Sequence, residues 1–205
     1  GGDVLISGNQ AANDGGGICW MGGPLDLFGG TITDNTAKNY GGIYFSNSGY
    51  SSLPLELNLK GNVVVKGNTA GTDEQTVDSN LATKVYGSSG AAITIVDAMG
   101  ENAEIGVTPS GVDFSIQGYD DYVSGSGVNV FFMDQPGKYG FVINKDGSLG
   151  VETHKHVFTY TEEGDTITAV CASEDPYDCT CKEEGSPLSI YPTTKVYRYD
   201  GNAVK

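Results

Sequence analysis

Short apolar segments, each ending in a polar turn, recur through the first half of the chain. In three of them an apolar residue stands three positions before an Asn, and an Ala follows two positions after that Asn. The segments are Val4–Asn9, Gly30–Asn35 and Val63–Asn68, followed by Ala11, Ala37 and Ala70. A second element, Gly16–Trp20, returns as Gly41–Phe45. Short apolar stretches of this kind are typical of β-strands, and their repetition is typical of a solenoid.

In a solenoid, each short strand pairs in parallel with the equivalent strand of the next coil and points one face inward. We therefore expect Ile6, Ile32 and Val65 to stack as an aliphatic ladder. Asn and Gly suit the turns because both tolerate a left-handed backbone conformation. Stacked Asn side chains can also hydrogen-bond to the coils above and below.

The apolar runs at 128–132 and 141–143 are separated by Gly and Pro. We interpret them as further β-structure that closes the end of the solenoid, because an uncovered terminal coil would expose backbone and apolar core. The sequence thus predicts one β-domain over residues 1–150, with a capping segment at its end.

The pattern changes after Gly150. Residues 154–160 and 166–171 alternate cleanly on either side of 162–165, which we interpret as a four-residue hairpin loop. This predicts a small antiparallel module over residues 151–193. We interpret residues 194–205 as a linker or the truncated start of a further repeat.

The charge of the chain limits its partners. Among 205 residues, 26 are Asp or Glu and 11 are Lys or Arg, which gives a net charge of −15. Such a surface repels phosphate backbones and anionic membranes, and no apolar run is long enough to cross a bilayer. We therefore expect no nucleic-acid partner and no membrane insertion. Because the first residue is Gly1, we expect the chain to be part of a longer protein.

The G-G-x-I and I-x-x-N-x-A repeats resemble the right-handed parallel β-helix repeats of large bacterial surface proteins. These include polymorphic outer-membrane proteins and the long adhesin-like proteins of gut Firmicutes. The resemblance covers roughly residues 1–95. The segments that follow resemble the last coils of those Firmicutes proteins, namely Val85–Tyr86, Ile93–Ile95 and Ile105–Val107.

This resemblance implies an all-β chain, with a right-handed parallel β-helix and a small antiparallel β module at its C-terminus. It also implies a secreted protein of the bacterial cell surface, with a non-catalytic structural or adhesive role. A host glycan or protein would be the ligand, and further extracellular repeats would continue the chain. The H-x-H-x-F-x-Y segment resembles a short repeat found beside β-helices in the same proteins, and Val196–Ala203 resembles the Y-D-G start of a β-sandwich repeat.

The histidines and most of the cysteines of the chain lie in this C-terminal module. Counting outward from the predicted loop places His156 opposite Cys171, with His154 on the same face. Cys179 or Cys181 could supply a fourth ligand. Two imidazoles and two thiolates suit a closed structural zinc site, and zinc would stabilise a module too small to bury much core.

A disulfide is the alternative at these cysteines. In an oxidising exterior Cys171 could pair with Cys179 or Cys181, and the histidines would then be ordinary strand residues. Sequence alone leaves both possibilities open. We interpret Cys19, within a repeat strand, as a small buried apolar residue.

A β-helix enzyme that degrades polysaccharides, either a lyase or a glycoside hydrolase, is the alternative function. Pectate lyases use an Arg or Lys base, but the only Arg of this chain is Arg198, far from the repeats. Inverting hydrolases use paired carboxylates, and the Asp-Asp doublet Asp120–Asp121 is the candidate pair near the repeats, with Asp113 close in sequence. We interpret the doublet as a solvated loop.

Two further clusters have a structural and a functional interpretation. The aromatic residues Trp20, Tyr44, Phe45 and Tyr50 could stack on sugar rings from a flat face, but we favour core positions for them. Asp73, Glu74 and Asp78 could join a surface calcium site, although no D-x-D-x-D-G loop is present.

Overall fold

The computed structural model describes residues 4–46, 55–72, 75–84, 91–126, 129–135, 138–153, 158–163, 166–171 and 188–189. The chain divides into two compact units, Gly1–His154 and Lys155–Lys205. The division lies beyond Gly150 because β18 (Leu149–Thr153) pairs within the first unit. No helix among these residues is long and apolar enough to span a membrane.

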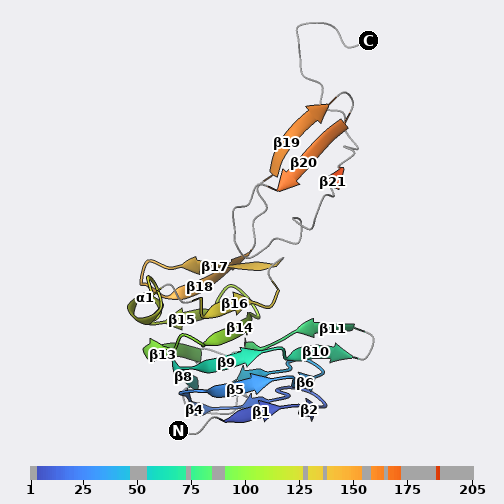
Figure 1. The fold of residues 1–205 in the computed structure, drawn as a ribbon. Helices are drawn as coiled ribbons and strands as arrows, with labels where there is room; N and C mark the ends of the chain where they lie inside the picture. The colour runs from blue at the N-terminus through green and yellow to red at the C-terminus, as the bar shows by residue number, and fades with distance from the viewer. Residues whose placement is uncertain are drawn as a thin grey trace, which may run out of the picture. The chain divides into compact units, whose positions relative to one another are not determined.

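The first unit consists of β-strands and one short helix, α1 (Tyr119–Tyr122) (Figure 1). Its described strands form three sheets. The first sheet has the order β1 (Leu5–Ser7), β5 (Gly30–Thr33), β9 (Val63–Lys66), β14 (Glu104–Thr108), β12 (Leu81–Lys84), β7 (Ile43–Ser46) and β3 (Ile18–Trp20), with β16 (Phe131–Met133) paired to β14. The second has the order β11 (Gln75–Asp78), β10 (Thr69–Thr72), β6 (Thr36–Ala37) and β2 (Gln10–Ala11). The third has the order β17 (Tyr139–Ile143), β18, β15 (Ser115–Gln117), β13 (Ala91–Met99), β8 (Leu55–Gly61) and β4 (Gly23–Leu27).

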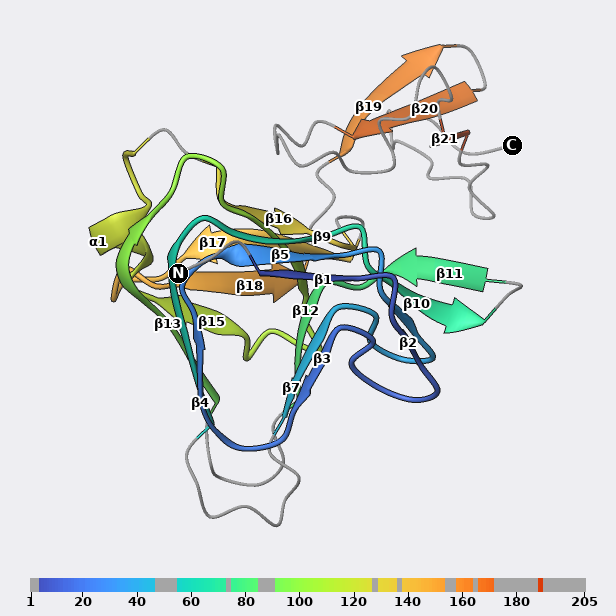
Figure 2. The ribbon, with the colours of Figure 1, turned by 60° about the horizontal axis from the view of Figure 1, so that its bottom comes forward.

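The chain passes through these sheets in repeated circuits (Figure 2). The first circuit is β1 to β4, the second is β5 to β8, and the third is β9 to β13. Equivalent strands of successive circuits pair in parallel, so that Ile6 lies beside Ile32 and Ile32 beside Val65. The predicted all-β class, the parallel pairing and the aliphatic ladder are therefore confirmed.

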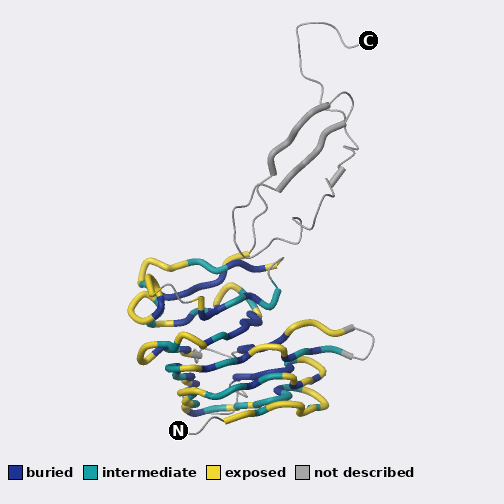
Figure 3. Tube along the Cα trace, in the orientation of Figure 1, coloured by how far each residue is buried: buried dark blue, intermediate teal, exposed yellow. Residues whose placement is uncertain are grey.

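Inward-facing residues of the three sheets form the core of the first unit. One column runs from Leu57 to Ile93 and Ile116 in the third sheet, and these side chains are at most 2% exposed. The opposite column joins Ile43 to Leu81 in the first sheet. Figure 3 shows these buried stretches in dark blue, above a first circuit that is mostly teal and yellow.

Strand β14 joins two stacks that are separate in the earlier circuits. It pairs with β9 through Ile105 and Val65, and with β12 through Val107 and Leu81. β14 thus spans the position where the earlier circuits turn from the first sheet into the second. The second sheet has no described strand from this circuit, and it ends in an antiparallel hairpin of β10 and β11. Beyond β14, β16 adds one more parallel strand, and β18 pairs antiparallel with β15 and β17. The predicted runs at 128–132 and 141–143 thus contribute β16 and β17.

Glycine pairs permit close approach between circuits. A Cβ on Gly41 would overlap the carbonyl oxygen of Thr69, and one on Gly42 would overlap that of Asn80. The pairs Gly16–Gly17 and Gly41–Gly42 do not have a left-handed backbone, and the Asn residues of the repeats do not have one either. The left-handed residue is the one that precedes each Asn, as at Asp34 with a φ of 55°. The left-handed residue is therefore a Gly in two of the three turns, Gly8 and Gly67, and the Asn that follows it has an ordinary backbone.

The second unit contains an antiparallel sheet of β19 (Phe158–Glu163), β20 (Thr166–Cys171) and β21 (Leu188–Ser189). Glu163 pairs with Thr166, so the predicted four-residue loop is wrong and only 164–165 separate the strands. Gly followed by Asp is a dipeptide typical of two-residue hairpin loops. The shift of register places Cys171 opposite Phe158 and not opposite His156.

Candidate functional site

Asn side chains at one corner of the first unit form a continuous hydrogen-bonded ladder. Oδ1 of Asn35 accepts hydrogen bonds from the backbone N and Nδ2 of Asn9, at 3.0 and 2.9 Å. Oδ1 of Asn68 accepts the same two bonds from Asn35, and Oδ1 of Asn80 accepts them from Asn68. Asn35, Asn68 and Asn80 are at most 1% exposed. The predicted stacking of Asn side chains is confirmed.

Each buried amide also binds backbone. Nδ2 of Asn68 donates to the carbonyl oxygen of Ile32 at 2.9 Å and to that of Lys66 at 3.1 Å. Nδ2 of Asn35 makes the equivalent bonds, to the carbonyl oxygen of Ile6 in the first circuit and to that of Thr33 in its own. Buried polar groups must find such partners, because an unpaired one costs about 1–3 kcal/mol. The ladder therefore links neighbouring circuits through fully paired buried amides.

The ladder ends at the carboxylate of Asp134. Oδ1 accepts a hydrogen bond from Nδ2 of Asn80 at 2.6 Å, and Oδ2 accepts one from the Asn80 backbone N at 2.8 Å. The hydroxyl of Thr108 also donates to Oδ2, at 2.5 Å. Burial raises the pKa of Asp134, and nearby Asp78 adds to this effect, while the three hydrogen bonds oppose it.

Gly106 provides the space in which Asn80 and Asp134 meet. A Cβ at this position would collide with Nδ2 of Asn80 and Oδ1 of Asp134. It would also lie 2.7 Å from Cζ of Phe132, on β16. Position 106, in the middle of β14, therefore requires glycine, because any larger residue would overlap the side chains of Asn80, Asp134 and Phe132.

A groove of about 510 Å³ lies along the outward side of β9, β14 and β16. Lys66 and Glu104 form an ion pair in it, and both side chains are about half exposed, at 48% and 44%. The half-buried ring of Phe132 lines it beside Glu101 and Asn102. An aromatic ring flanked by amide and carboxylate groups can stack on a sugar and hydrogen-bond its hydroxyls. Sequence analysis did not identify this groove, because its residues come from separate repeats.

The predicted zinc ligands lie mostly outside the described residues. The structure does not describe His154, His156, Cys179 or Cys181. Cys171 is described and is the last residue of β20. Since Cys171 is opposite Phe158, the cross-strand argument for pairing it with His156 no longer holds. The zinc site and its disulfide alternative both stay predictions. Elsewhere in the described chain, no three His, Cys, Asp or Glu side chains could hold a metal ion together.

The acidic doublet lies on a helix and not in the predicted loop. Asp120 and Asp121 occupy the short helix α1, and both are exposed, as a solvated pair should be. Asp113 is also exposed, in the turn before β15, and lines a separate small pocket. Asp78 is exposed on β11, while Asp73–Glu74 and the tail with Arg198 lie outside the described residues.

Tyr44 and Phe45 are buried, as favoured from the sequence, and Phe45 belongs to the hydrophobic core. Tyr44 and Phe45 are 5% and 0% exposed, and the ring of Tyr44 stacks on Tyr40 with centroids 4.6 Å apart. Trp20 is partly buried against the core, and Tyr50 and Val85–Tyr86 are not among the described residues.

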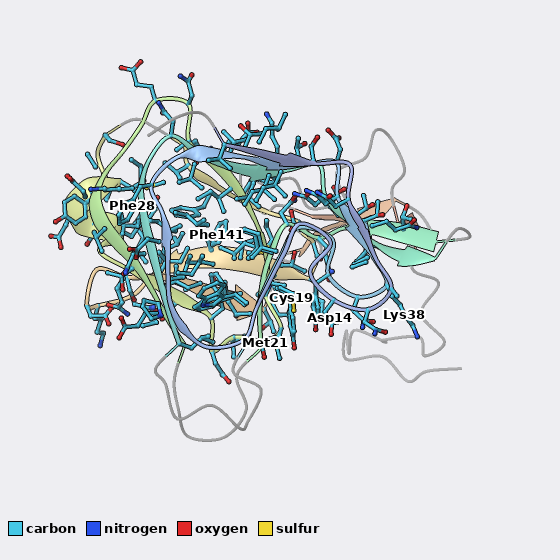
Figure 4. The ribbon with its side chains drawn as sticks, turned by 90° about the horizontal axis from the view of Figure 1, so that it is seen from below. Asp14, Cys19, Met21, Phe28, Lys38 and Phe141 are labelled. Atoms are coloured by element: carbon cyan, nitrogen blue, oxygen red, sulfur yellow. The ribbon has the colours of Figure 1, made fainter. Side chains whose placement is uncertain are left out.

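Cys19 is exposed, which corrects our interpretation of it as buried. It occupies the outward position of the edge strand β3, beside Tyr44 of the next circuit. No further circuit covers this edge among the described residues. Partial burial of the thiol and the nearby charge of Asp14 raise the pKa of Cys19. Figure 4 shows Cys19 and Asp14 at the open end of the unit.

Comparison of the chain with protein-family models, curated proteins and solved structures finds no match.

Proposed function

We propose that residues 1–153 form a right-handed parallel β-helix that serves as a non-catalytic structural or adhesive segment of a secreted bacterial surface protein. The Asn ladder is the observation that carries this proposal. Buried polar side chains in this unit bind the neighbouring circuits, and Asn35 and Asn68 each make contacts to both sides. A chain of this kind gains stability as each circuit is added to its neighbour, which suits an extended stalk on a cell surface.

The groove beside Phe132 is the best candidate for adhesion. Its polar groups suit a neutral sugar, whereas the net charge of −15 disfavours anionic ligands. The aromatic ring of Phe132 would contact the apolar face of the sugar. Glu101, Asn102 and Glu104 would then bind its hydroxyls. A host glycan is therefore the first ligand to test, with a host protein as the second.

One observation favours the alternative, a polysaccharide-degrading enzyme. Glu101 and Glu104 line the same groove, with the cationic Lys66 beside them. However, Glu101 is exposed and the Lys66–Glu104 pair is open to water. General acids of glycosidases occupy desolvated positions. The open groove fits binding better than turnover.

A glycan array and a polysaccharide panel separate these two functions. We expect the full chain to bind neutral glycans on the array and to release neither reducing ends nor unsaturated uronates from the panel. Phe132→Ala should weaken glycan binding about two- to tenfold, because stacking on a ring contributes about 0.5–1.5 kcal/mol. Tyr122→Ala, a partly exposed aromatic residue on α1, is the matched control and should bind normally.

The outcomes have distinct meanings. Turnover that is lost in the Glu101→Gln, Glu104→Gln double variant would establish the enzyme and overturn the adhesive proposal. Binding that is equal in the Phe132 and Tyr122 variants would move the adhesive surface away from this groove. If the array and a screen for host proteins both show no binding, the adhesive role fails and only the structural role stands.

The same proposal puts the protein outside the cell and includes a structural zinc ion in the predicted module of residues 151–193. His154, His156, Cys171 and Cys179 would be the ligands, and further extracellular repeats would continue the chain. The chemistry of this donor set supports zinc, since imidazole and thiolate are its usual ligands in structural sites.

A further inference from the structure

The end of the Asn ladder lies directly beside the aromatic ring of the groove. Phe132 pairs with Gly106 in the register of β14 and β16, and Asp134 follows two positions later, just after the end of β16. A Cβ on Gly106 would lie 2.7 Å from Cζ of Phe132 and 2.5 Å from Oδ1 of Asp134. The tip of the ring and the carboxylate therefore occupy the same small space above β14.

The ring of Phe132 leans across β14. Neighbouring strands of a sheet are about 4.8 Å apart, so a ring that stood straight out from β16 would keep its tip well away from Gly106. Pairing of β9 and β16 with β14 through Ile105 places Lys66 and Phe132 on either side of Gly106 (Figure 1). The ring thus extends over the glycine, toward the strand that carries Lys66.

The carboxylate of Asp134 is fixed on the other side of the ring tip. Its oxygens accept hydrogen bonds from the backbone N and Nδ2 of Asn80 and from the hydroxyl of Thr108. Its backbone N donates to the carbonyl oxygen of Val107 at 3.0 Å. Asn80 and Thr108 are themselves buried, whereas Phe132 is half-buried in an open groove. Asp134 is therefore a rigid neighbour for a side chain that has more freedom.

Contact with a carboxylate suits the edge of an aromatic ring. The ring quadrupole makes the edge electropositive and the face electronegative, and Cζ is an edge atom. A ring held at its edge keeps a face available to the groove. Ordering a side chain during binding weakens association, so a ring that is ordered beforehand binds more tightly.

We infer that Asp134 is a positioning residue for glycan binding, which holds the ring of Phe132 across β14 and does not itself contact the sugar. This inference rests on the proposed glycan-binding groove. The ladder that links the circuits then has a second role, because its last member orients the aromatic wall of the groove. Gly106 is required for both roles, since the ring tip and the carboxylate share the space above it.

NMR of the full chain tests the contact without any glycan. Phenylalanine is labelled with ¹³C at Cζ, and the variant Phe132→Leu identifies the signal of Phe132. Protonation of Asp134 changes the charge beside this atom, so the chemical shift of the signal should follow a carboxyl titration. Asp134→Asn should abolish that titration.

Other charged groups near the ring serve as controls for the titration. Lys66, Glu101 and Glu104 line the same groove, and Asp78 on β11 lies near Asp134. Lys66 stays charged throughout the range in which carboxyl groups titrate. The titration of the Phe132 signal should therefore persist in the Glu101→Gln, Glu104→Gln double variant and in Asp78→Asn.

A cycle of single and double variants tests the effect on binding, with the neutral oligosaccharide that binds most tightly on the glycan array. We expect Asp134→Ala to weaken binding about two- to tenfold, because the released ring must be ordered again. In a Phe132→Ala background the same change should have no further effect, since Asp134 acts through the ring. Asp134→Asn retains the size of the side chain and an oxygen beside the ring, so it should bind normally. Asn9→Ala removes the ladder bond farthest from the groove and is the matched control.

The failures are distinguishable. A Phe132 signal that does not titrate, or that titrates unchanged in Asp134→Asn, would overturn the inference and leave the groove as a candidate. An equal loss of affinity from Asp134→Ala in both backgrounds would show that Asp134 acts on the fold and not through the ring. Hydrogen exchange of β8 checks that each variant is folded, and if Asp134→Ala is not, the NMR comparison with Asp134→Asn decides alone. Absence of binding to every glycan would overturn the proposed adhesive function, while the NMR titration would still establish or refute the contact.

Discussion

Asn80 and Asp134 meet across the backbone of Gly106, with Nδ2 of Asn80 only 2.6 Å from Oδ1 of Asp134. The two residues are 54 positions apart, and each belongs to a different circuit. β14 lies between them in the sheet and contributes only the Thr108 hydroxyl to the contact. One absent side chain therefore allows the ladder to continue past a circuit that has no Asn of its own.

Replacing Gly106 should break this contact. We expect Gly106→Ala to lower the free energy of unfolding by about 1–3 kcal/mol, the usual effect of forcing a methyl group into a packed site. Urea denaturation measures the change. Gly111→Ala is the matched control, because its Cβ would meet nothing within 4 Å, and it should be neutral or slightly stabilising. Equal stability of the two variants would show that Asn80 and Asp134 do not need the space.

Asp134 gives the unit a specific dependence on pH. Burial raises its folded pKa above the ordinary value of 3.8, so the folded state binds the proton more tightly than the unfolded chain. Its contribution to stability is therefore greatest below pH 3.8 and declines as the pH rises through the folded pKa. Asp134→Asn removes this titration and retains an acceptor for Nδ2 of Asn80. Other carboxylates also titrate, so the difference between the two proteins is the informative quantity.

The stability advantage of Asp134→Asn over the natural protein should be constant below pH 3.8 and grow as the pH rises toward neutral. Urea denaturation of both proteins at a series of pH values measures that difference. Parallel curves across the range would mean that Asp134 titrates alike in the folded and unfolded states. An advantage that shrinks with pH would mean that its hydrogen bonds outweigh its burial.

Asn68 should be among the most sensitive polar positions in the chain. Its removal leaves donors on Asn35 and an acceptor on Asn80 unpaired in a fully buried site. Because each such group costs about 1–3 kcal/mol, Asn68→Ala should lower the free energy of unfolding by more than about 3 kcal/mol. Thermal or urea denaturation would reveal the loss.

Ser79→Ala is the control for Asn68→Ala. Ser79 is equally buried, at 1% exposed, but its hydroxyl has no partner within the described structure. Removing an unpaired hydroxyl should leave stability unchanged or raise it. If the two variants lose similar stability, the loss reflects side-chain packing and the ladder has no special role.

The repeats made much of this architecture predictable. The parts of the structure formed by residues outside the repeats could not be predicted. The three I/V-x-x-N-x-A segments indicate parallel strands and stacked Asn, because one spacing defines both the inward apolar residue and the polar corner. Asn80 and Asp134 complete the same ladder but belong to no repeat. Their contact depends on β14 pairing with both β9 and β12. This pairing results from the packing of whole circuits, and no local sequence pattern indicates it.

The hairpin of the second unit illustrates a different limit. Strict alternation identified its two strands, but alternation is unchanged when the register shifts by two residues. The loop length decides the partner of Cys171, and Gly164–Asp165 was the informative signal. Thus the faces of the strands were predictable while the residue opposite Cys171 was not.

Zinc and disulfide in the predicted module of residues 151–193 make opposite predictions for the same protein. We expect the full chain, purified without chelator under reducing conditions, to contain one zinc ion per chain by elemental analysis, because a module of this size buries little core and gains folding free energy from metal binding. Cys171→Ser and His156→Ala should each abolish the zinc and lower the melting temperature of this unit. Cys19→Ser, at an exposed thiol in the first unit, should retain the metal in full.

The intact mass of the oxidised protein tests the disulfide alternative. A bridge from Cys171 to Cys179 or Cys181 removes two hydrogens, and in that case His156→Ala should be as stable as the natural protein. Metal-free reduced protein together with that mass loss would establish the disulfide and remove zinc from the proposal.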